Sequence, residues 1–117
     1  MKNIVQIGCF IEPDYIIERY IKIGYNVYLI DANIENLEKI RKIVNGYNNV
    51  KTFNVAISGN SGEKVFYRTD VKDAGHFSFN RESVRLAGNP KDKIEGTSVS
   101  ALSLEDFCTN HEIKKID

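Results

Sequence analysis

Hydrophobic and polar positions in the first half of the chain follow two alternating patterns. Short apolar runs rich in β-branched residues predict buried parallel strands at Asn3 to Gly8, Tyr25 to Asp31 and Asn49 to Ser58. Between these runs, apolar residues recur at helical spacing and predict amphipathic helices over residues 13–24 and 33–47. This order, with its short connections, predicts a parallel sheet with right-handed crossovers.

The pattern changes after Ser58. Glycines at both ends of the segment 59–62 indicate a tight turn, and the strand expected at 63–70 is placed to pair with the preceding strand as a hairpin. Residues 71–93 show no clear period, so we expect a long loop there with a short helical turn at 81–86. A further strand is expected at 94–103.

A capped helix and a strand-like tail end the sequence. Ser103 is the expected N-cap of a short helix, with Asp106 at the third helical position. The tail, Ile113 to Asp117, reads "IKKID" and has the composition of a strand that lies inside a sheet. We therefore expect one α/β domain over residues 1–117, Rossmann-like and doubly wound with a mainly parallel sheet, that is incomplete at its C-terminal end. The tail is expected to lie beside the first strand.

The first strand-to-helix turn is the main candidate for chemistry. Gly8 follows the first strand, and Asp31 ends the second, 23 residues later. A helix N-terminus beside such a turn offers free N–H groups, and an acid about 20 residues on can accept hydrogen bonds from ribose hydroxyls. This spacing predicts a site for a ribose-bearing cofactor.

The turn lacks the glycines that a dinucleotide requires. The pyrophosphate of a dinucleotide is bound by a turn of sequence GxGxxG, whereas the residues after Gly8 are Cys9, Phe10, Ile11 and Glu12. S-adenosylmethionine carries an ammonium, a carboxylate and a sulfonium but no phosphate, and a glycine-poor turn with acids nearby suits it better. Two alternatives stay open: an NAD(P)-dependent oxidoreductase fragment and a degenerate, non-catalytic cofactor-binding module.

Several segments together resemble one enzyme family. The segments "IVQIGCFIEPDY", "VYLIDAN", "NNVKTFNVAIS", "GEKVFYRTD" and "SLEDFCTNHEIKKID" are similar, in order and spacing, to successive blocks of the FkbM-type methyltransferases. The resemblance implies a Rossmann-like enzyme that uses S-adenosyl-L-methionine to methylate a hydroxyl of a sugar or another small molecule. It covers nearly the whole chain, which stops just before the family's "K-I-D-V-E-G" motif.

The resemblance also implies roles for individual residues. Gly8 would lie beneath the methionine part of the cofactor, Asp31 would bind the ribose, and Ala56 would lie by the adenine. Gln6 stands where the family usually has an acid, and its amide oxygen can accept a hydrogen bond from the ammonium. No catalytic base is assigned, although His76, in the expected loop, is a candidate because its pKa is near neutrality.

Composition argues against several kinds of partner and site. Sixteen basic and sixteen acidic residues balance, so net charge gives no argument for nucleic acid or an anionic membrane as partner. The two cysteines, Cys9 and Cys108, have no CxxC partner, which argues against a disulfide framework or a zinc site and for the reducing cytoplasm. No apolar run approaches the length of a membrane helix, and no metal cluster is visible. The oligomeric state is left open.

Overall fold

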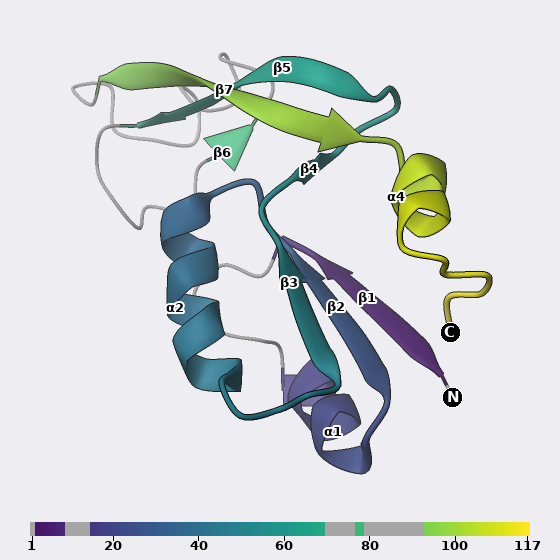
Figure 1. The fold of residues 1–117 in the computed structure, drawn as a ribbon. Helices are drawn as coiled ribbons and strands as arrows, with labels where there is room; N and C mark the ends of the chain where they lie inside the picture. The colour runs from purple at the N-terminus through teal and green to yellow at the C-terminus, as the bar shows by residue number, and fades with distance from the viewer. Residues whose placement is uncertain (1, 9–14, 70–76, 79–92) are drawn as a thin grey trace.

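The computed structural model describes residues 2–8, 15–69, 77–78 and 93–117. These residues form an α/β fold that contains three helices and a three-stranded parallel sheet in the order β1-β2-β3 (Figure 1). The elements in chain order are β1 (Asn3–Ile7), α1 (Tyr15–Ile23), β2 (Asn26–Ile30), α2 (Ile34–Val44), β3 (Val50–Phe53), β4 (Ala56–Ile57), β5 (Gly62–Thr69), β6 (Phe77–Ser78), β7 (Ile94–Leu102) and α4 (Leu104–Asn110). The strand–helix alternation predicted for the first half is therefore confirmed, and it is compatible with a Rossmann-like arrangement.

One face of the parallel sheet packs against α1 and α2. Side chains of successive strand residues point to opposite faces, so Val27 and Leu29 of β2 share a face. They form a buried cluster there with Ile21 of α1 and Ile40 of α2. The apolar spacing predicted these inward residues, whereas Ile43 of the same expected stripe is exposed.

The opposite face packs against α4 and the tail. Tyr28 and Ile30 of β2 cluster there with Phe107 of α4 and with Ile113, which follows that helix. The Phe107 ring is fully buried and meets the Tyr28 ring edge-on. Helices thus cover both faces of the three-stranded sheet, as a doubly wound fold requires.

The third predicted strand is wrong in its extent. The chain leaves the parallel sheet after Phe53, and Ala56–Ile57 join a second sheet of order β4-β7-β5-β6. In that sheet β4 runs parallel to β7, with Ala56 opposite Ala101. Both alanines are buried, and the chain changes sheets through Asn54, which is exposed, and Val55, which packs against the core.

The predicted hairpin is also wrong. β5 pairs antiparallel along its whole length with β7, and not with the strand before it. Its other neighbour is β6, a two-residue strand that falls within the segment expected to be loop. The expected helical turn at 81–86 lies outside the described residues. Because only β4 with β7 is parallel in this second sheet, a mainly parallel arrangement holds for β1, β2 and β3 alone.

The tail lies beside the first strand, as expected. The backbone N–H of Asp117 donates to the carbonyl of Asn3 at 2.8 Å, and the Asn3 N–H donates to the Asp117 carboxylate at 3.0 Å. The Asn3 side chain also donates to the Lys115 carbonyl. Residues 113–117 are nevertheless not a strand. The two ends of the chain lie next to each other (Figure 1).

The predicted cap of α4 is confirmed. The Ser103 hydroxyl accepts a hydrogen bond from the Asp106 N–H at 3.0 Å. Ser61, from the turn before β5, completes this helix start: its hydroxyl accepts from the Ser103 N–H at 3.0 Å and donates to the Asp106 carboxylate. A loop distant in sequence therefore satisfies a donor that helix starts leave free.

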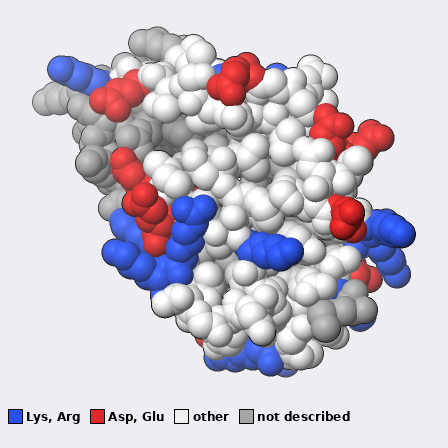
Figure 2. Space-filling view, in the orientation of Figure 1, with Lys and Arg blue, Asp and Glu red and all other residues white. Residues whose placement is uncertain are grey.

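The surface carries charges of both signs. On the face shown in Figure 2, basic and acidic residues lie near one another at several places toward the edges, and the middle is uncharged apart from one basic residue. One basic side chain, Arg41, donates to the Thr52 hydroxyl, and another, Lys22, pairs with Glu18. Among the described residues, no helix has the length and apolarity needed to cross a membrane.

Candidate cofactor site

Gly8 and Asp31 lie side by side at the carboxyl-terminal edge of the parallel sheet. The strands that carry them are parallel neighbours, with Ile7 opposite Ile30, and the Gly8 N–H donates to the Ile30 carbonyl at 2.8 Å. One residue on, the Asp31 N–H donates to the Phe53 carbonyl at 3.1 Å. The adjacency expected from the sequence is confirmed.

Glycine suits its position in this turn. Gly8 has a φ of +79°, a conformation that residues with a Cβ rarely adopt. A Cβ built at Gly8 would meet no atom of the described residues within 4 Å. Backbone conformation therefore requires glycine here. Among the described residues nothing fills the space beside it, so they leave the backbone accessible to a ligand.

β1 has a neighbour on each side. From β1 the chain passes through α1 to β2 on one side, whereas the tail that follows α4 reaches the other side of β1 at Asn3. The helices α1 and α4 pack on opposite faces of the sheet. Open α/β sheets bind ligands outside the carboxyl ends of their strands, which is where Gly8 and Asp31 lie.

Asp31 is a buried carboxyl with a defined partner. The residue is 8% exposed, and its Oδ1 accepts a hydrogen bond from the Asn33 N–H at 2.8 Å. Asn33 in turn caps α2, since its side-chain oxygen accepts the Glu35 N–H at 3.0 Å. The carboxylate is thus held against the start of α2, and because a carboxylate offers about four acceptor positions it can also accept from a ligand hydroxyl.

Asn54 fixes the same turn from the neighbouring strand. Its side-chain Nδ2 donates to the carbonyls of Asp31 at 3.0 Å and of Ala32 at 3.1 Å. Asn49, at the other end of β3, makes the same kind of double contact, with the carbonyls of Ile21 at 2.9 Å and Tyr25 at 2.8 Å. Asn54 was not among the residues predicted from the sequence. The sequence marks it only as an amide residue that interrupts the apolar run of the third strand.

The remaining predicted site residues are Gln6, Ala56 and His76. Gln6 is two residues before Gly8 on β1, opposite Leu29, and therefore points to the face that packs against α1 and α2. Its side-chain oxygen is shielded from solvent. Ala56 lies in the second sheet, buried against β7, two residues beyond Asn54. His76 lies outside the described residues.

The residues present fit an uncharged nucleoside better than a phosphate. A ribose hydroxyl can donate to the Asp31 carboxylate, and the open space at Gly8 can take a ligand against the backbone. Within the described ranges, no group of three or more His, Cys, Asp or Glu side chains is placed to hold a metal ion. A buried carboxylate here would repel an anionic phosphate placed next to it.

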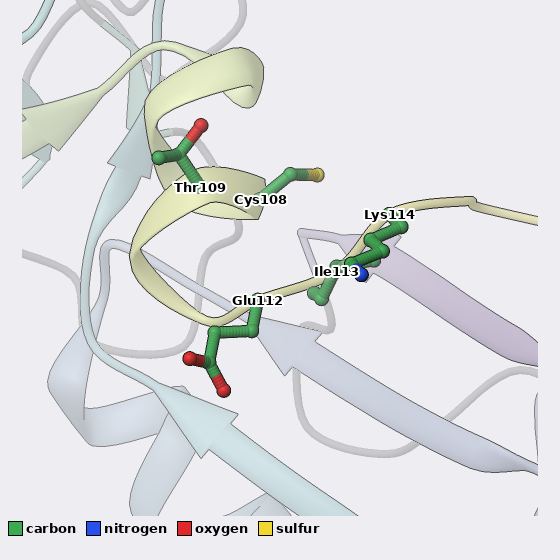
Figure 3. A pocket seen from close by; sticks show the side chains of 5 residues that line it. All are labelled: Cys108, Thr109, Glu112, Ile113 and Lys114. Atoms are coloured by element: carbon green, nitrogen blue, oxygen red, sulfur yellow. The ribbon is translucent and has the colours of Figure 1, made fainter.

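A separate hollow lies at the end of α4. It measures about 530 Å³ and is lined by Cys108, Thr109, Glu112, Ile113 and Lys114 (Figure 3). The free thiol of Cys108 is half-buried and packs at the border of the cluster around Phe107. None of the predicted cofactor-binding residues lines this hollow.

Comparisons with known proteins give no functional assignment. No protein-family model, curated protein or solved structure matches the chain. The geometry around Gly8, Asp31 and Asn54 is therefore the basis for a functional proposal.

Proposed function

We propose that this chain is a Rossmann-like domain that binds S-adenosyl-L-methionine and belongs to a methyltransferase acting on a hydroxyl of a small molecule. The observation that carries the proposal is the pairing of Gly8 with Asp31 on neighbouring parallel strands, joined by the hydrogen bond from the Gly8 N–H to the Ile30 carbonyl. A turn with an open backbone next to a carboxylate provides one surface for the polar tail of a nucleoside and one acceptor for its ribose. The resemblance of the chain to FkbM-type methyltransferases points to the same ligand.

Each candidate residue has a role in this proposal. Asp31 accepts hydrogen bonds from the ribose hydroxyls, and Gly8 allows the methionine part to approach the backbone. Gln6 accepts from the ammonium through its amide oxygen, and Ala56 lies by the adenine, as the resemblance implies. When bound, S-adenosylmethionine supplies an electrophilic methyl group on a positively charged sulfur.

The protein's contribution to the chemistry is then mainly alignment. An acceptor hydroxyl held in line with the reactive carbon needs little further activation, since proximity and orientation lower the barrier by a large factor. The hydroxyl proton leaves as its oxygen is methylated, and His76 is the candidate to receive it. The acceptor is a sugar or another small natural product, on the strength of the resemblance alone.

A second candidate function is a non-catalytic binding module. The observation that favours it is the hydrogen bond of 2.8 Å from the Asn33 N–H to Asp31, because this contact gives the carboxylate a structural role without a ligand. An NAD(P)-dependent enzyme shares the strand and acid pattern but needs a pyrophosphate site, which the segment after Gly8 does not offer in sequence.

Calorimetric titration of the chain with four ligands tests the proposal. S-adenosylmethionine and S-adenosylhomocysteine are expected to bind, and NADH and NADPH are not. Binding of either dinucleotide in preference to S-adenosylhomocysteine would support the oxidoreductase, and binding of none of the four would contradict a cofactor site at Gly8. Methyl transfer to a panel of sugars then separates the enzyme from the binding module.

A further inference from the structure

We infer that Asn54 is a positioning residue, which fixes the turn after β2 so that the Asp31 carboxylate faces a ligand hydroxyl in one orientation. The inference rests on the proposed function, because it assigns a ligand hydroxyl to Asp31. It adds a residue that the strand and acid pattern does not contain.

The hydrogen bonds of Asn54 carry the inference. One amide nitrogen donates to two successive carbonyls, those of Asp31 and Ala32, at 3.0 and 3.1 Å. An amide group has two N–H donors, so a single side chain satisfies both carbonyls of the turn. Hydrogen bonds to both carbonyls restrict the rotation of the peptide group between these two residues.

The peptide group held by Asn54 is the one that directs the carboxylate. On one side of it, the Asp31 N–H is bound to the Phe53 carbonyl at 3.1 Å. On the other side, the Asn33 N–H is bound to the Asp31 carboxylate at 2.8 Å. Asn54 therefore closes the set of contacts that keeps the backbone of this turn, and through it the acid, in one conformation.

Asn54 itself is exposed and lies between two sheets. It follows the last residue of β3 and precedes β4 by two residues. An exposed asparagine is dispensable for the hydrophobic core, so its effect on a ligand can be separated from a general loss of folding. This separation makes the inference testable by substitution.

Asn49 provides a matched control within the same chain. It makes two hydrogen bonds of the same type, from Nδ2 to the carbonyls of Ile21 and Tyr25, at the opposite end of β3. Asn54→Asp and Asn49→Asp each replace two donors by an acceptor that faces two carbonyl oxygens. Both variants should lose stability, but only Asn54→Asp should disturb the cofactor turn.

The experiment measures S-adenosylhomocysteine affinity by calorimetry and the exchange rate of the Asn33 amide by NMR, at a temperature where all variants are folded. In Asn54→Asp we expect the dissociation constant to rise about tenfold, the usual effect of losing one hydrogen bond of moderate strength, and Asn33 exchange to accelerate similarly. Asn49→Asp should leave both within about twofold of wild type, an interval well below a tenfold change. Asn54→Gln, which retains the donors, should recover most of the affinity.

Two results would overturn the inference: wild-type affinity and wild-type Asn33 exchange in Asn54→Asp, or equal losses of affinity in both aspartate variants. A wild-type chain that binds none of the nucleoside ligands would refute the proposed function instead. The positioning of the turn is then judged by exchange alone, where acceleration confined to Asn54→Asp supports it and equal rates in the two variants overturn it.

Discussion

Gly24 and Glu112 occupy the same position in two helix-ending turns of the same kind. After α1, the Tyr25 N–H donates to the Tyr20 carbonyl at 3.1 Å, and Gly24 has a φ of +99°. After α4, the Ile113 N–H donates to the Cys108 carbonyl at 2.8 Å, and Glu112 has a φ of +56°. Both are Schellman motifs, in which glycine is the preferred residue at the left-handed position. Glu112 is the residue other than glycine with a positive φ in the described part of the chain.

Replacing Glu112 with glycine should therefore stabilise the protein. The left-handed conformation costs an L-residue roughly 1–2 kcal/mol, which glycine avoids. Part of this gain is offset because glycine loses more conformational entropy on folding. We expect the free energy of unfolding in urea to rise by about 0.5–1 kcal/mol. As a control, Glu105→Gly in the first turn of α4 makes the same chemical change and should lower stability by about 0.5–1 kcal/mol. A fall in stability for Glu112→Gly would show that the glutamate side chain has a stabilising role of its own.

Removal of the Asp31 carboxylate should weaken cofactor binding. Asp31→Ala should raise the dissociation constants of S-adenosylmethionine and S-adenosylhomocysteine alike, because the two carry the same ribose. Hydrogen bonds to a charged acceptor are worth roughly 1.5–3 kcal/mol, so a loss of about ten- to a hundredfold is expected in calorimetry.

A second substitution guards this test against simple misfolding. Asp31→Asn keeps an oxygen that can accept the Asn33 N–H and should preserve the turn, yet it removes the charge and should still weaken binding. Asp106→Ala, which removes a carboxylate bound to Ser61 far from the turn in sequence, should cost stability but leave affinity unchanged. Unaltered affinity in both Asp31 variants would remove the ribose assignment.

The Ser61 hydroxyl should stabilise the start of α4. It accepts the Ser103 N–H and donates to Asp106, so Ser61→Ala leaves both groups without this partner. Because the site is exposed and water can replace part of these contacts, we expect a loss of about 1 kcal/mol in urea unfolding. Ser58→Ala in the same loop is the matched control: among the described residues, its hydroxyl meets the Asn60 N–H alone, at 3.5 Å, and should matter by less than about 0.5 kcal/mol.

Acid should weaken the contact between the tail and β1. The hydrogen bond from the Asn3 N–H lowers the pKa of the Asp117 carboxyl below its ordinary value, and nearby Lys115 acts in the same direction. A carboxyl with a lowered pKa in the folded state stabilises that state above its ordinary pKa, and the contribution is lost as pH falls through the lowered value. The Asn3 amide resonance should therefore titrate below about pH 4. Asp117→Asn should abolish this titration, and its persistence in that variant would assign it to another group.

The local pattern of the sequence was sufficient for part of the fold. Apolar alternation and helical spacing located β1, β2 and α2, since these elements bury one face against their immediate neighbours in the chain. Ser103 predicted the start of α4 correctly, because a cap depends only on residues three positions apart. The adjacency of Gly8 and Asp31 followed from the parallel order of two strands joined by one helix.

The remaining features depend on contacts between distant residues. β5 pairs with β7 and not with the strand before it, and no feature of either strand specifies its partner. From the sequence, the third strand is expected to continue through Asn54. The break there becomes evident only from the hydrogen bonds of the Asn54 amide to the carbonyls of Asp31 and Ala32. Glu112 has no sequence signal at all, because glycine or asparagine is the usual mark of a left-handed residue.

The contact between Asn3 and Asp117 also constrains the order of assembly. The two residues are 114 positions apart, so β1 is synthesised well before the segment that lies along its outer side. Until then, one side of β1 offers backbone groups to any extended segment nearby, including a nascent copy of the same chain. Contacts between such distant residues form slowly, because a long loop must close before they can stabilise anything. β1 therefore stays at risk of pairing wrongly while the whole of the intervening chain is being synthesised.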